Sequence, residues 1–342
     1  MEQELAQVWE ELLGVEPIGA TDDFFDLGGH SLLAVRLLSV VEERLGMRLP
    51  LARFFEGPTV AGMAAALQRE GGVSRSSPLV PLVASGSRLP FFCVHPLGGY
   101  VFCYRKLANA LDADQPFYAL QARGLEVDEE PHRSFADMVS FYVEAVREAQ
   151  PNGPYLLGGW SYGAQVAFDM ACALEAAGEE VSALVLIDGE SFDRIDEADL
   201  LAEVQPHRML TAIANQLAIP VDAAELERLG TDRAVACVAE LAGPALTEAG
   251  VRRVLEVATA NLAAGLGHVS RRYAGPIAVV RGSAEHRREQ ALGPDLGWAA
   301  LSEGPITTHT VPGDHYAMLY EPNVAALART LRGILLPANE RR

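Results

Sequence analysis

The sequence predicts two domains, a small all-α helical bundle over residues 1–70 and a larger α/β domain over residues 89–338. In the first part, apolar side chains recur at helical spacing and no strand pattern is present. The second part alternates short apolar runs with helical stretches, which is typical of a parallel sheet covered by helices. Residues 71–88 open with the Gly- and Ser-rich segment GGVSRSSP, which favours a linker between the two domains.

The first domain is expected to contain three amphipathic helices. One covers residues 3–14, the next begins at Ser31, and the last follows a Pro58-Thr59 cap and ends near Leu67. Helices of this kind bury their apolar faces against one another, so we expect a helical bundle. The apolar positions that define the first two helices are Leu5, Val8, Trp9, Leu12 and Leu13, and then Leu33, Leu37, Val40, Val41 and Leu45.

The second domain is expected to be built on a sheet of short, buried strands. Helices are expected between the strands, at residues 135–149 and 162–177. Chains in which strands alternate with helices form parallel sheets. The strand candidates are Phe91–Val94, Phe117–Leu120, Tyr155–Leu157, Val181–Ile187 and Ile277–Val280.

The interval from Asp188 to Ile277 has no convincing strand and is longer than a crossover helix requires. We interpret residues from about 190 to 265 as a helical lid inserted over the carboxyl edge of the sheet, where open α/β folds bind ligands. The alternative is a set of helices that only extends the core. Apolar residues at helical spacing indicate the extra helices, at Leu200, Leu201, Val204, Leu210, Ile213 and Leu217.

Charge and composition exclude several classes of partner. The chain has 27 basic and 46 acidic residues and a net charge of −19, whereas nucleic acids and anionic membranes attract basic patches. No window approaches about 18 uninterrupted apolar residues and no targeting segment is present, so we expect a cytoplasmic protein. Buried free thiols, rather than disulfides or a metal site, are expected because no C-x-x-C spacing occurs among Cys93, Cys103, Cys172 and Cys237.

Ser31 follows two glycines and a histidine and opens the second expected helix. The simplest interpretation is a helix N-cap after a glycine turn. A helix N-terminus also stabilises negative charge through its free N–H groups and its dipole, so a phosphodiester on Ser31 would suit this position. Gly28 and Gly29 would leave room for a modifying enzyme. Ser31 is therefore a candidate attachment site.

A second serine lies in a different kind of turn. Ser161 is the centre of the segment Gly159-Trp160-Ser161-Tyr162-Gly163, between the expected strand YLLGG and an expected helix. In such a Gly-x-Ser-x-Gly elbow, small residues two positions to either side avoid clashes with the tight backbone at the serine. The strand before and the helix after make the motif specific for a nucleophile at the carboxyl edge of the sheet.

A nucleophilic serine needs a base, and the base needs an acid that orients it, in the chain order serine, acid, histidine. Among the histidines after Ser161, His315 lies in a turn before the final helix, from which it could reach the sheet edge. His309 lies within a strand-like run, and His286 lies among charged residues. His315 is therefore the favoured base.

The acid has two candidates. Asp188 ends the strand that precedes the expected lid, and Glu285 follows the next expected strand. An aspartate at the end of a fully apolar strand is costly to bury without a partner, which favours Asp188. Glu285 is accounted for by surface pairing with Arg287 or Arg288, an arrangement of little energetic consequence.

Residues 1–70 resemble the peptidyl carrier domains of nonribosomal peptide synthetases, through the stretches DDFFDLGGHSLLAVRL and FFEGPTVAGMA. The resemblance implies that Ser31 carries a covalent 4′-phosphopantetheine arm with an acyl thioester at its tip. It also implies a phosphopantetheinyl transferase that attaches the arm, and upstream condensation and adenylation domains that supply the acyl chain.

Residues 89–335 resemble the type I thioesterase domains that terminate such synthetases, through FFCVHPLGGYVFCY, YLLGGWSYGAQVAF, LVLIDGE and LGWAALSEGPITTHTVPGDHYAMLYEPNV. The resemblance implies an α/β-hydrolase fold, in which nucleophile, acid and base are Ser161, Asp188 and His315. It also assigns the amides of the oxyanion hole to Leu97 and Tyr162. The aspartate is thus favoured further as the acid.

Together the two resemblances imply release of a peptidyl chain from Ser31 through an ester on Ser161, followed by hydrolysis or macrocyclisation. Three other interpretations stay open: a proofreading hydrolase that clears misloaded carriers, a general esterase beside an unrelated helical domain, and a noncatalytic module that docks acyl carriers. The peptide, the ring size and the lid conformation are also open, as is whether the chain is a natural didomain or part of a longer synthetase.

Overall fold

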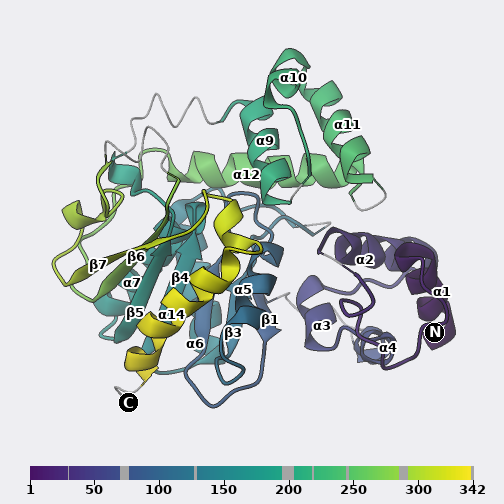
Figure 1. Ribbon diagram of the computed structural model, residues 1–342, viewed down its shortest axis with the longest axis horizontal. Coiled ribbons are helices and arrows are strands. Elements are labelled where there is room, and N and C mark those ends of the chain that lie inside the picture. The colour runs from purple at the N-terminus through teal and green to yellow at the C-terminus, as the bar shows by residue number, and fades with distance from the viewer. Residues whose placement is uncertain are drawn as a thin grey trace.

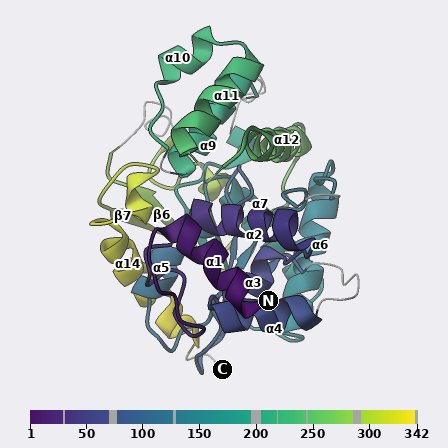
Figure 2. The same cartoon turned by 90° about the vertical axis from the view of Figure 1, so that its right-hand side faces the viewer.

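The computed structural model describes residues 1–29, 31–69, 77–126, 129–194, 204–217, 219–243, 246–284 and 292–339, without the side chains of Ser31 and Leu32. In this part of the chain a helical domain stands beside a larger domain, in which helices cover both faces of a sheet (Figure 1, Figure 2). Further helices lie over one end of the sheet. The predicted fold class is confirmed.

The N-terminal domain is helical, as predicted. Trp9, Phe24 and Phe54 are fully buried at its centre, with ring centroids between 5.0 and 6.2 Å apart and edge-to-face packing. One short helix, α3, was not expected from the sequence. The core is formed by the apolar faces of α1 (Glu2–Leu13), α2 (Ser31–Leu45), α3 (Leu51–Glu56) and α4 (Val60–Arg69).

The larger domain contains a sheet with the strand order β1-β3-β2-β4-β5-β6-β7. Neighbouring strands are parallel except β1 and β3, which run antiparallel. The predicted strands are confirmed, but β1 lies inside the predicted linker and makes the sheet mixed instead of wholly parallel. The strands are β1 (Leu79–Val83), β2 (Phe91–Val94), β3 (Phe117–Leu120), β4 (Tyr155–Trp160), β5 (Val181–Ile187), β6 (Ile277–Gly282) and β7 (Ile306–Val311).

Helices cover both faces of the sheet and enclose a separate apolar core on each. The central strands are buried on both faces, as their continuous apolar sequences predict. The first face is covered by α6 (Phe135–Ala149) and α7 (Tyr162–Ala176), and the second by α5 (Arg105–Ala110) and α14 (Val324–Asn339). Short 3₁₀ turns lie at Phe102–Tyr104, Phe192–Arg194, Trp298–Ala300 and Ala317–Leu319.

The predicted lid is a set of helices between β5 and β6. They share an apolar cluster of their own, which includes Leu210, Val235 and Val251, so they form an inserted unit and do not only extend the core. Residues 195–203, which contain two leucines used in the prediction, lie outside the described residues. The lid helices, seen above the sheet in Figure 1, are α9 (Pro206–Gln216), α10 (Ala223–Arg228), α11 (Thr231–Ala242) and α12 (Glu248–Gly265).

The helical domain packs directly on the larger domain and on the lid. Phe55 of α3 contacts Phe102 with ring centroids 5.9 Å apart, and the guanidinium carbon of Arg105 lies 3.4 Å from the ring centre of Phe25. Leu33, near the start of α2, packs against the apolar cluster of the lid. Figure 2, seen from the side of the helical domain, shows α2 below α9 and α12.

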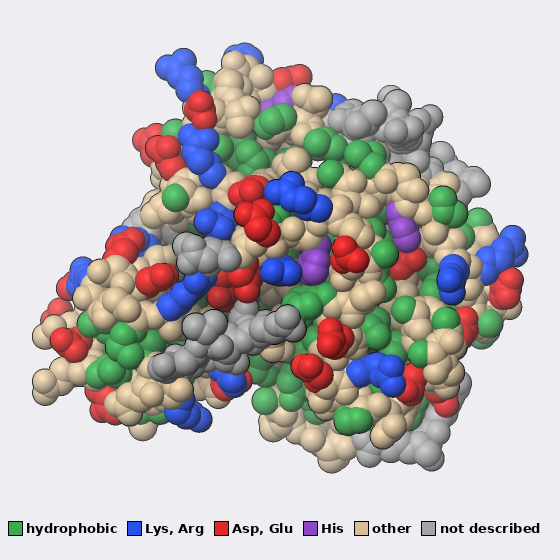
Figure 3. Space-filling model, turned by 180° about the vertical axis from the view of Figure 1, so that it is seen from behind, with side chains coloured by type: hydrophobic (Ala, Val, Ile, Leu, Met, Phe, Trp, Pro, Cys, Tyr) green, Lys and Arg blue, Asp and Glu red, His purple; other side chains and the backbone are tan. Residues whose placement is uncertain are grey.

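The surface carries mixed charge. Figure 3 shows Lys and Arg side chains interspersed with Asp and Glu over the coloured part of the face that it views. Within the described residues, no helix is both long enough and apolar enough to cross a membrane. Of the cysteines, Cys93, Cys103 and Cys172 are buried as predicted, whereas Cys237 is half-buried.

Candidate active site

Ser161 stands on a sharp turn between β4 and α7. Its backbone has φ 59° and ψ −125°, a conformation that residues with side chains rarely adopt, so the surrounding packing must hold it. A Cβ at Gly163 would come within 2.6 Å of the carbonyl oxygen of His95, so glycine is needed where the turn meets the end of β2. The N–H of Ser161 donates to the carbonyl of Ile187 at 2.9 Å, which fixes the turn against β5.

Two residues from later in the chain meet Ser161 at this turn. The Nε2 atom of His315 lies 3.0 Å from Oγ of Ser161, and its Nδ1 atom lies 2.8 Å from Oδ2 of Asp188. Because an ionised carboxylate only accepts hydrogen bonds, Nδ1 carries the proton and Nε2 accepts from the serine hydroxyl. The three side chains therefore form a continuous hydrogen-bonded series, in the tautomer that a general base requires.

Asp188 is held in place and kept ionised. It is 6% exposed, its Oδ1 atom accepts the N–H of Gly282 at 2.7 Å, and its own N–H donates to the carbonyl of Val280 at 2.7 Å. Burial acts to raise the pKa of Asp188, but the hydrogen bond and charge of His315 and the N–H of Gly282 outweigh burial and lower the pKa. The carboxylate is therefore ionised at neutral pH.

His315 lies in the turn that follows β7, where Gly313 adopts φ 104°. Trp160, the residue before the serine, donates from Nε1 to the carbonyl of His315 at 3.1 Å, and the two ring centroids are 4.9 Å apart. Trp160 is almost fully buried, so the backbone of His315 is fixed to the end of β4. The imidazole is thereby positioned between its acid and its hydroxyl partners.

His309, which the sequence also offered, and His268 lie on other segments of the chain. His309 lies in β7 itself, ahead of the turn that presents the base. His268, in the segment after α12, has its Nε2 atom 2.9 Å from Oδ1 of Asp169 on α7. Glu285 and His286 lie outside the described residues. Within the described part, the predicted acid and base are the side chains that reach the serine, and their catalytic roles remain predictions.

The amides predicted to form the oxyanion hole lie on the loop after β2 and at the start of α7. The carbonyl of Pro96 accepts from Nδ1 of His95 at 2.8 Å and from the N–H of Gly99 at 2.9 Å. Because the peptide unit is planar and trans, the N–H of Leu97 points away from that carbonyl. Among the described residues, neither this N–H nor that of Tyr162 donates to a protein acceptor. Both amides are thus available to a ligand.

His95 is a structural residue of the same loop. It is fully buried, and because Nδ1 donates to the carbonyl of Pro96, Nε2 accepts from the hydroxyl of Tyr142 at 2.7 Å. Burial lowers the pKa of His95 to about 4, against the opposing effect of the hydrogen bond to Pro96. His95 is therefore neutral at pH 7 and holds the loop through its single N–H without carrying a positive charge.

Ser31 is the first residue of α2, and its side chain lies outside the described residues. In the turn before it, a Cβ at Gly29 would collide with the ring of Phe24, whereas a Cβ at Gly28 would meet no atom of the described residues within 4 Å. The turn is thus packed on one side and open on the other. With 15 residues, α2 presents free N–H groups and a positive dipole end at its start, so this position fits a phosphodiester-linked group.

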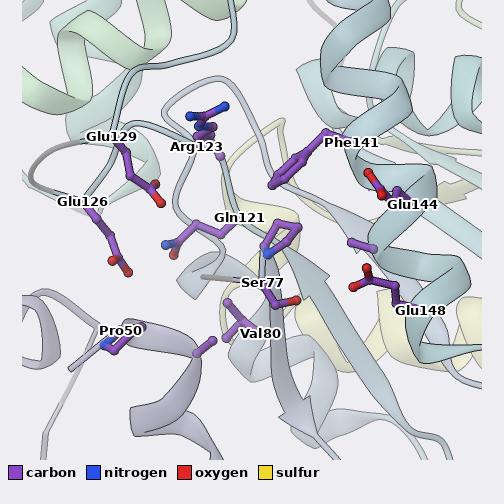
Figure 4. A pocket seen from close by; sticks show the side chains of 14 residues that line it. Pro50, Ser77, Val80, Gln121, Arg123, Glu126, Glu129, Phe141, Glu144 and Glu148 are labelled. Atoms are coloured by element: carbon purple, nitrogen blue, oxygen red, sulfur yellow. The ribbon is translucent and has the colours of Figure 1, made fainter. Parts of the chain in front are cut away.

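A cavity of about 330 Å³ lies between the helical domain and the larger domain (Figure 4). Pro50 of the helical domain lies across it from Phe141 and Glu148 of α6. Its walls include none of the three side chains that meet at the elbow, and neither of the predicted oxyanion residues. This cavity is therefore separate from the site around Ser161.

The sequence reasoning missed two lid residues that contact the oxyanion loop, Gln216 on α9 and Asn261 on α12. Both are buried, with 7% and 2% of their surfaces exposed. A signal was present, since Asn261 follows Val254 and Val257 at helical spacing and so interrupts the apolar face of α12. A polar residue on an apolar helix face requires a partner inside the protein.

Comparison with known families agrees with the two-domain organisation. Residues 3–67 match the family model of the phosphopantetheine attachment site, and residues 89–335 match that of the thioesterase domain. Because the second match covers more than half of the chain, the chain belongs to the thioesterase family, joined here to a carrier domain of the nonribosomal peptide synthetase type. Carrier domains of this kind hold 4′-phosphopantetheine covalently.

Curated relatives are nonribosomal peptide synthetases. The dimodular nonribosomal peptide synthase of Bacillus subtilis (strain 168) is 46% identical over 187 residues, which are 55% of this chain and 8% of the relative. The chondramide synthase cmdD of Chondromyces crocatus is 33% identical over an alignment of 353 positions, which covers 97% of this chain and 9% of the relative. The chain therefore spans less than a tenth of the length of these relatives.

Solved structures resemble both domains. A holo four-domain nonribosomal peptide synthetase bound to AMP and glycine is 28% identical with a TM-score of 0.67, over 97% of this chain and 26% of that one. The Vlm2 thioesterase domain is 25% identical with a TM-score of 0.59, over 75% of this chain and 96% of that one. The carrier and the thioesterase folds thus both have counterparts of known structure.

Proposed function

We propose that this chain releases a peptidyl chain from its own carrier domain through an ester on Ser161. The observation that carries the proposal is the series of Asp188, His315 and Ser161, joined by contacts of 2.8 and 3.0 Å on a nucleophile elbow. The packing of the carrier domain against the lid supports delivery of the substrate from within the same chain. We assign the attachment of the substrate to Ser31.

When bound to Ser31, 4′-phosphopantetheine supplies a thiol that carries the acyl group as a thioester. The hydroxyl of Ser31 would hold the phosphodiester beside Gly28 and the first turn of α2, where the helix dipole favours negative charge. A phosphopantetheinyl transferase is the partner that this attachment requires. Upstream condensation and adenylation domains are the partners that would supply the peptidyl chain.

In the first half of the reaction, His315 takes the proton of Ser161 as Oγ attacks the carbonyl carbon of the thioester. Asp188 keeps the imidazole in the required tautomer and stabilises the imidazolium that forms. The N–H groups of Leu97 and Tyr162 donate to the carbonyl oxygen as it gains negative charge, which is usually the largest contribution to the rate. The C–S bond then breaks, His315 returns the proton to the leaving sulfur, and an ester remains on Ser161.

In the second half, His315 deprotonates the nucleophile that attacks the ester. The bond between the acyl carbon and Oγ of Ser161 then breaks, and His315 returns the proton to Oγ. Water gives a free acid, and an amine or hydroxyl of the peptidyl chain itself gives a macrocycle. Exclusion of water from the ester by the lid favours the macrocycle, and access of water favours the free acid. Product mass separates the two, because the ring is lighter than the acid by the mass of one water molecule.

The rival interpretations have less support. A module that only docks acyl carriers would not need a base in hydrogen-bond contact with a serine on an elbow. A general esterase would not need a carrier domain packed at its lid. A proofreading hydrolase shares the chemistry, but it predicts equal release from carriers added in trans, whereas we expect faster release from the attached carrier.

We expect Ser31→Ala to abolish loading of the chain. Incubated with a phosphopantetheinyl transferase and an acyl-coenzyme A, the wild-type protein should gain the mass of one acyl-phosphopantetheine, as measured by intact mass spectrometry. Ser39→Ala is the matched control, because Ser39 lies on the same helix and its hydroxyl donates to the carbonyl of Val35 at 3.2 Å. Loading of Ser31→Ala would overturn the carrier assignment.

We expect Phe55→Asp to slow transfer from the attached carrier about tenfold, because a carboxylate at this contact must be desolvated against the ring of Phe102. Hydrolysis of a soluble acyl thioester should be unchanged, since the catalytic side chains are untouched. Val15→Asp, at a position 37% exposed in the carrier domain, is the control and should alter neither rate. Equal single-turnover rates in all three proteins would show that this interface has no role in delivery.

A further inference from the structure

The loop that carries the predicted oxyanion amide is held by two lid helices. Asn261 of α12 donates from Nδ2 to the carbonyl of Leu97 at 2.9 Å. Gln216 of α9 accepts the N–H of Gly98 on Oε1 at 3.3 Å and donates from Nε2 to the carbonyl of Tyr100, also at 3.3 Å. The loop therefore exchanges three hydrogen bonds with buried lid amides.

Two of these bonds act on one peptide unit. The carbonyl of Leu97 and the N–H of Gly98 belong to the same planar group, so Asn261 holds one end of it and Gln216 holds the other. These two hydrogen bonds fix the orientation of the peptide plane between Leu97 and Gly98. The φ and ψ angles of Leu97 are then the only rotations that connect this plane to the preceding peptide unit. That preceding unit carries the N–H of Leu97, and His95 and the turn to Gly99 already hold its carbonyl.

The same lid residue reaches the second predicted oxyanion donor. The hydroxyl of Tyr162 donates to the backbone carbonyl of Asn261 at 2.9 Å. Asn261 thus contacts Leu97 through its side chain and Tyr162 through its backbone, so one residue spans the two positions whose N–H groups must converge on a single oxygen.

The contact with Gln216 requires a close approach. A Cβ at Gly98 would come within 2.8 Å of Oε1 of Gln216, so a larger residue there would push the amide away. The carbonyl of Gln216, in the last turn of α9, accepts from the hydroxyl of Tyr320 at 2.7 Å, which fixes this end of the lid to the catalytic domain. The backbone of Gln216 is therefore fixed where its side chain can form hydrogen bonds with Gly98 and Tyr100.

We infer that Asn261 and Gln216 are positioning residues of the oxyanion hole, so that the lid, besides covering the site, sets the geometry of the amide of Leu97. The inference rests on the proposed function. It gives the lid a role in the chemical step, because a donor displaced by about 1 Å loses most of its differential stabilisation of the oxyanion.

The test compares Asn261→Asp with wild type on a soluble acyl thioester. Aspartate keeps the shape of the side chain, but it cannot donate and places negative charge against the carbonyl of Leu97. We expect kcat to fall roughly 10²-fold with KM within twofold of wild type. A peptidyl boronic acid, which forms an anionic tetrahedral adduct with the serine, should bind more weakly by a similar factor.

Gln216→Glu is the second variant, because it keeps an acceptor for the N–H of Gly98 but replaces the donor to Tyr100 by a negatively charged oxygen. We expect a smaller loss in kcat, about tenfold, in keeping with the longer contacts of Gln216. Thr259→Val is the matched control, since Thr259 lies on the same helix as Asn261 and its hydroxyl donates to the carbonyl of Leu255 within that helix. It should leave kcat and boronate affinity unchanged.

The outcomes separate this inference from the proposed function. If Asn261→Asp lowers the melting temperature while kcat and boronate affinity match those of Thr259→Val, Asn261 is only structural and the inference is wrong. If Ser161→Ala keeps wild-type turnover, the proposed function itself is wrong. A selective fall in kcat in both lid variants, with Ser161-dependent turnover in wild type, would support both.

Discussion

Replacement of Ser161 by alanine is expected to lower kcat for acyl thioester hydrolysis on the order of 10⁶-fold. Alanine removes the oxygen that forms the ester, and His315 then has no hydroxyl proton to take. The residual rate, supplied by the oxyanion amides and by substrate binding, is expected to be about 10³ to 10⁴ times that in water. The measurement is steady-state release of free thiol from a soluble acyl thioester, followed with a thiol reagent.

Ser182→Ala is the control for that substitution. Ser182 lies in β5, is 6% exposed, and its hydroxyl donates to the carboxylate of Glu180 at 2.9 Å, away from the elbow. It should keep kcat within about twofold of wild type. If Ser161→Ala retained more than a tenth of the wild-type rate, Ser161 would not be the nucleophile.

Replacement of Asp188 by asparagine is expected to lower kcat about 10⁴-fold. An asparagine amide can donate to Nδ1 of His315, and this favours the tautomer with the proton on Nε2. His315 can then no longer take the proton of Ser161, although the side chain keeps its shape and its contact with Gly282. KM for the soluble substrate should change little, because Asp188 does not contact the acyl group in the proposed mechanism.

Glu285→Gln is the matched control, since Glu285 is the other acid that the sequence allows. We expect it to keep kcat within about threefold of wild type. The opposite pattern, in which Glu285→Gln loses activity and Asp188→Asn keeps it, would assign the role of the acid to Glu285 instead of Asp188.

The lowered pKa of Asp188 also predicts how stability depends on pH. A carboxylate with a lower pKa in the folded state contributes stability that is fully present above its unfolded pKa, about 3.9, and is lost as the pH falls through the folded value. Asp188→Asn lacks this contribution. The difference in melting temperature between wild type and variant should therefore shrink as the pH falls from about 5 towards 2. A difference that stays constant over this range would contradict the prediction.

Much of the fold could be predicted because each element has its own local signal. The apolar strands of the sheet and the helices that cover it follow from residue periodicity, and the flanking strand and helix identified the elbow at Ser161. Asp188 and His315 were predicted from their places after β5 and β7. The hydrogen bonds that join the three side chains depend on the folded topology and could be seen only in the structure.

The elements that were missed have weak local signals. The helix α3 has only six residues, fewer than two turns, so helical periodicity cannot be recognised in it. The strand β1 contains Pro81, and a proline argues against a central strand but is tolerated at a sheet edge, where β1 lies. Both elements lie at the domain interface, where α3 packs near β1 and contributes Leu51 and Phe55 to the contact with the larger domain.

The hydrogen bonds between the lid and the oxyanion loop could not be predicted from the sequence. Gln216 and Asn261 lie more than a hundred positions from the loop, and no motif links them to it. Their positions among apolar residues at helical spacing indicate that each needs a partner inside the protein, but that partner is determined only when α9 and α12 pack over the loop.

Following one acyl group along the chain shows directly whether release passes through Ser161. Ser31 would be loaded with an acyl-pantetheine, the reaction quenched at intervals and digested, and the acyl group quantified by mass spectrometry on the peptides that contain Ser31 and Ser161. We expect the acyl group to leave Ser31, pass through Ser161 and appear as acid or ring, and to stay on Ser31 in Ser161→Ala. Loss from Ser31 at the wild-type rate in Ser161→Ala, with no acyl group on the Ser161 peptide of the wild type at any time, would show that release does not pass through Ser161.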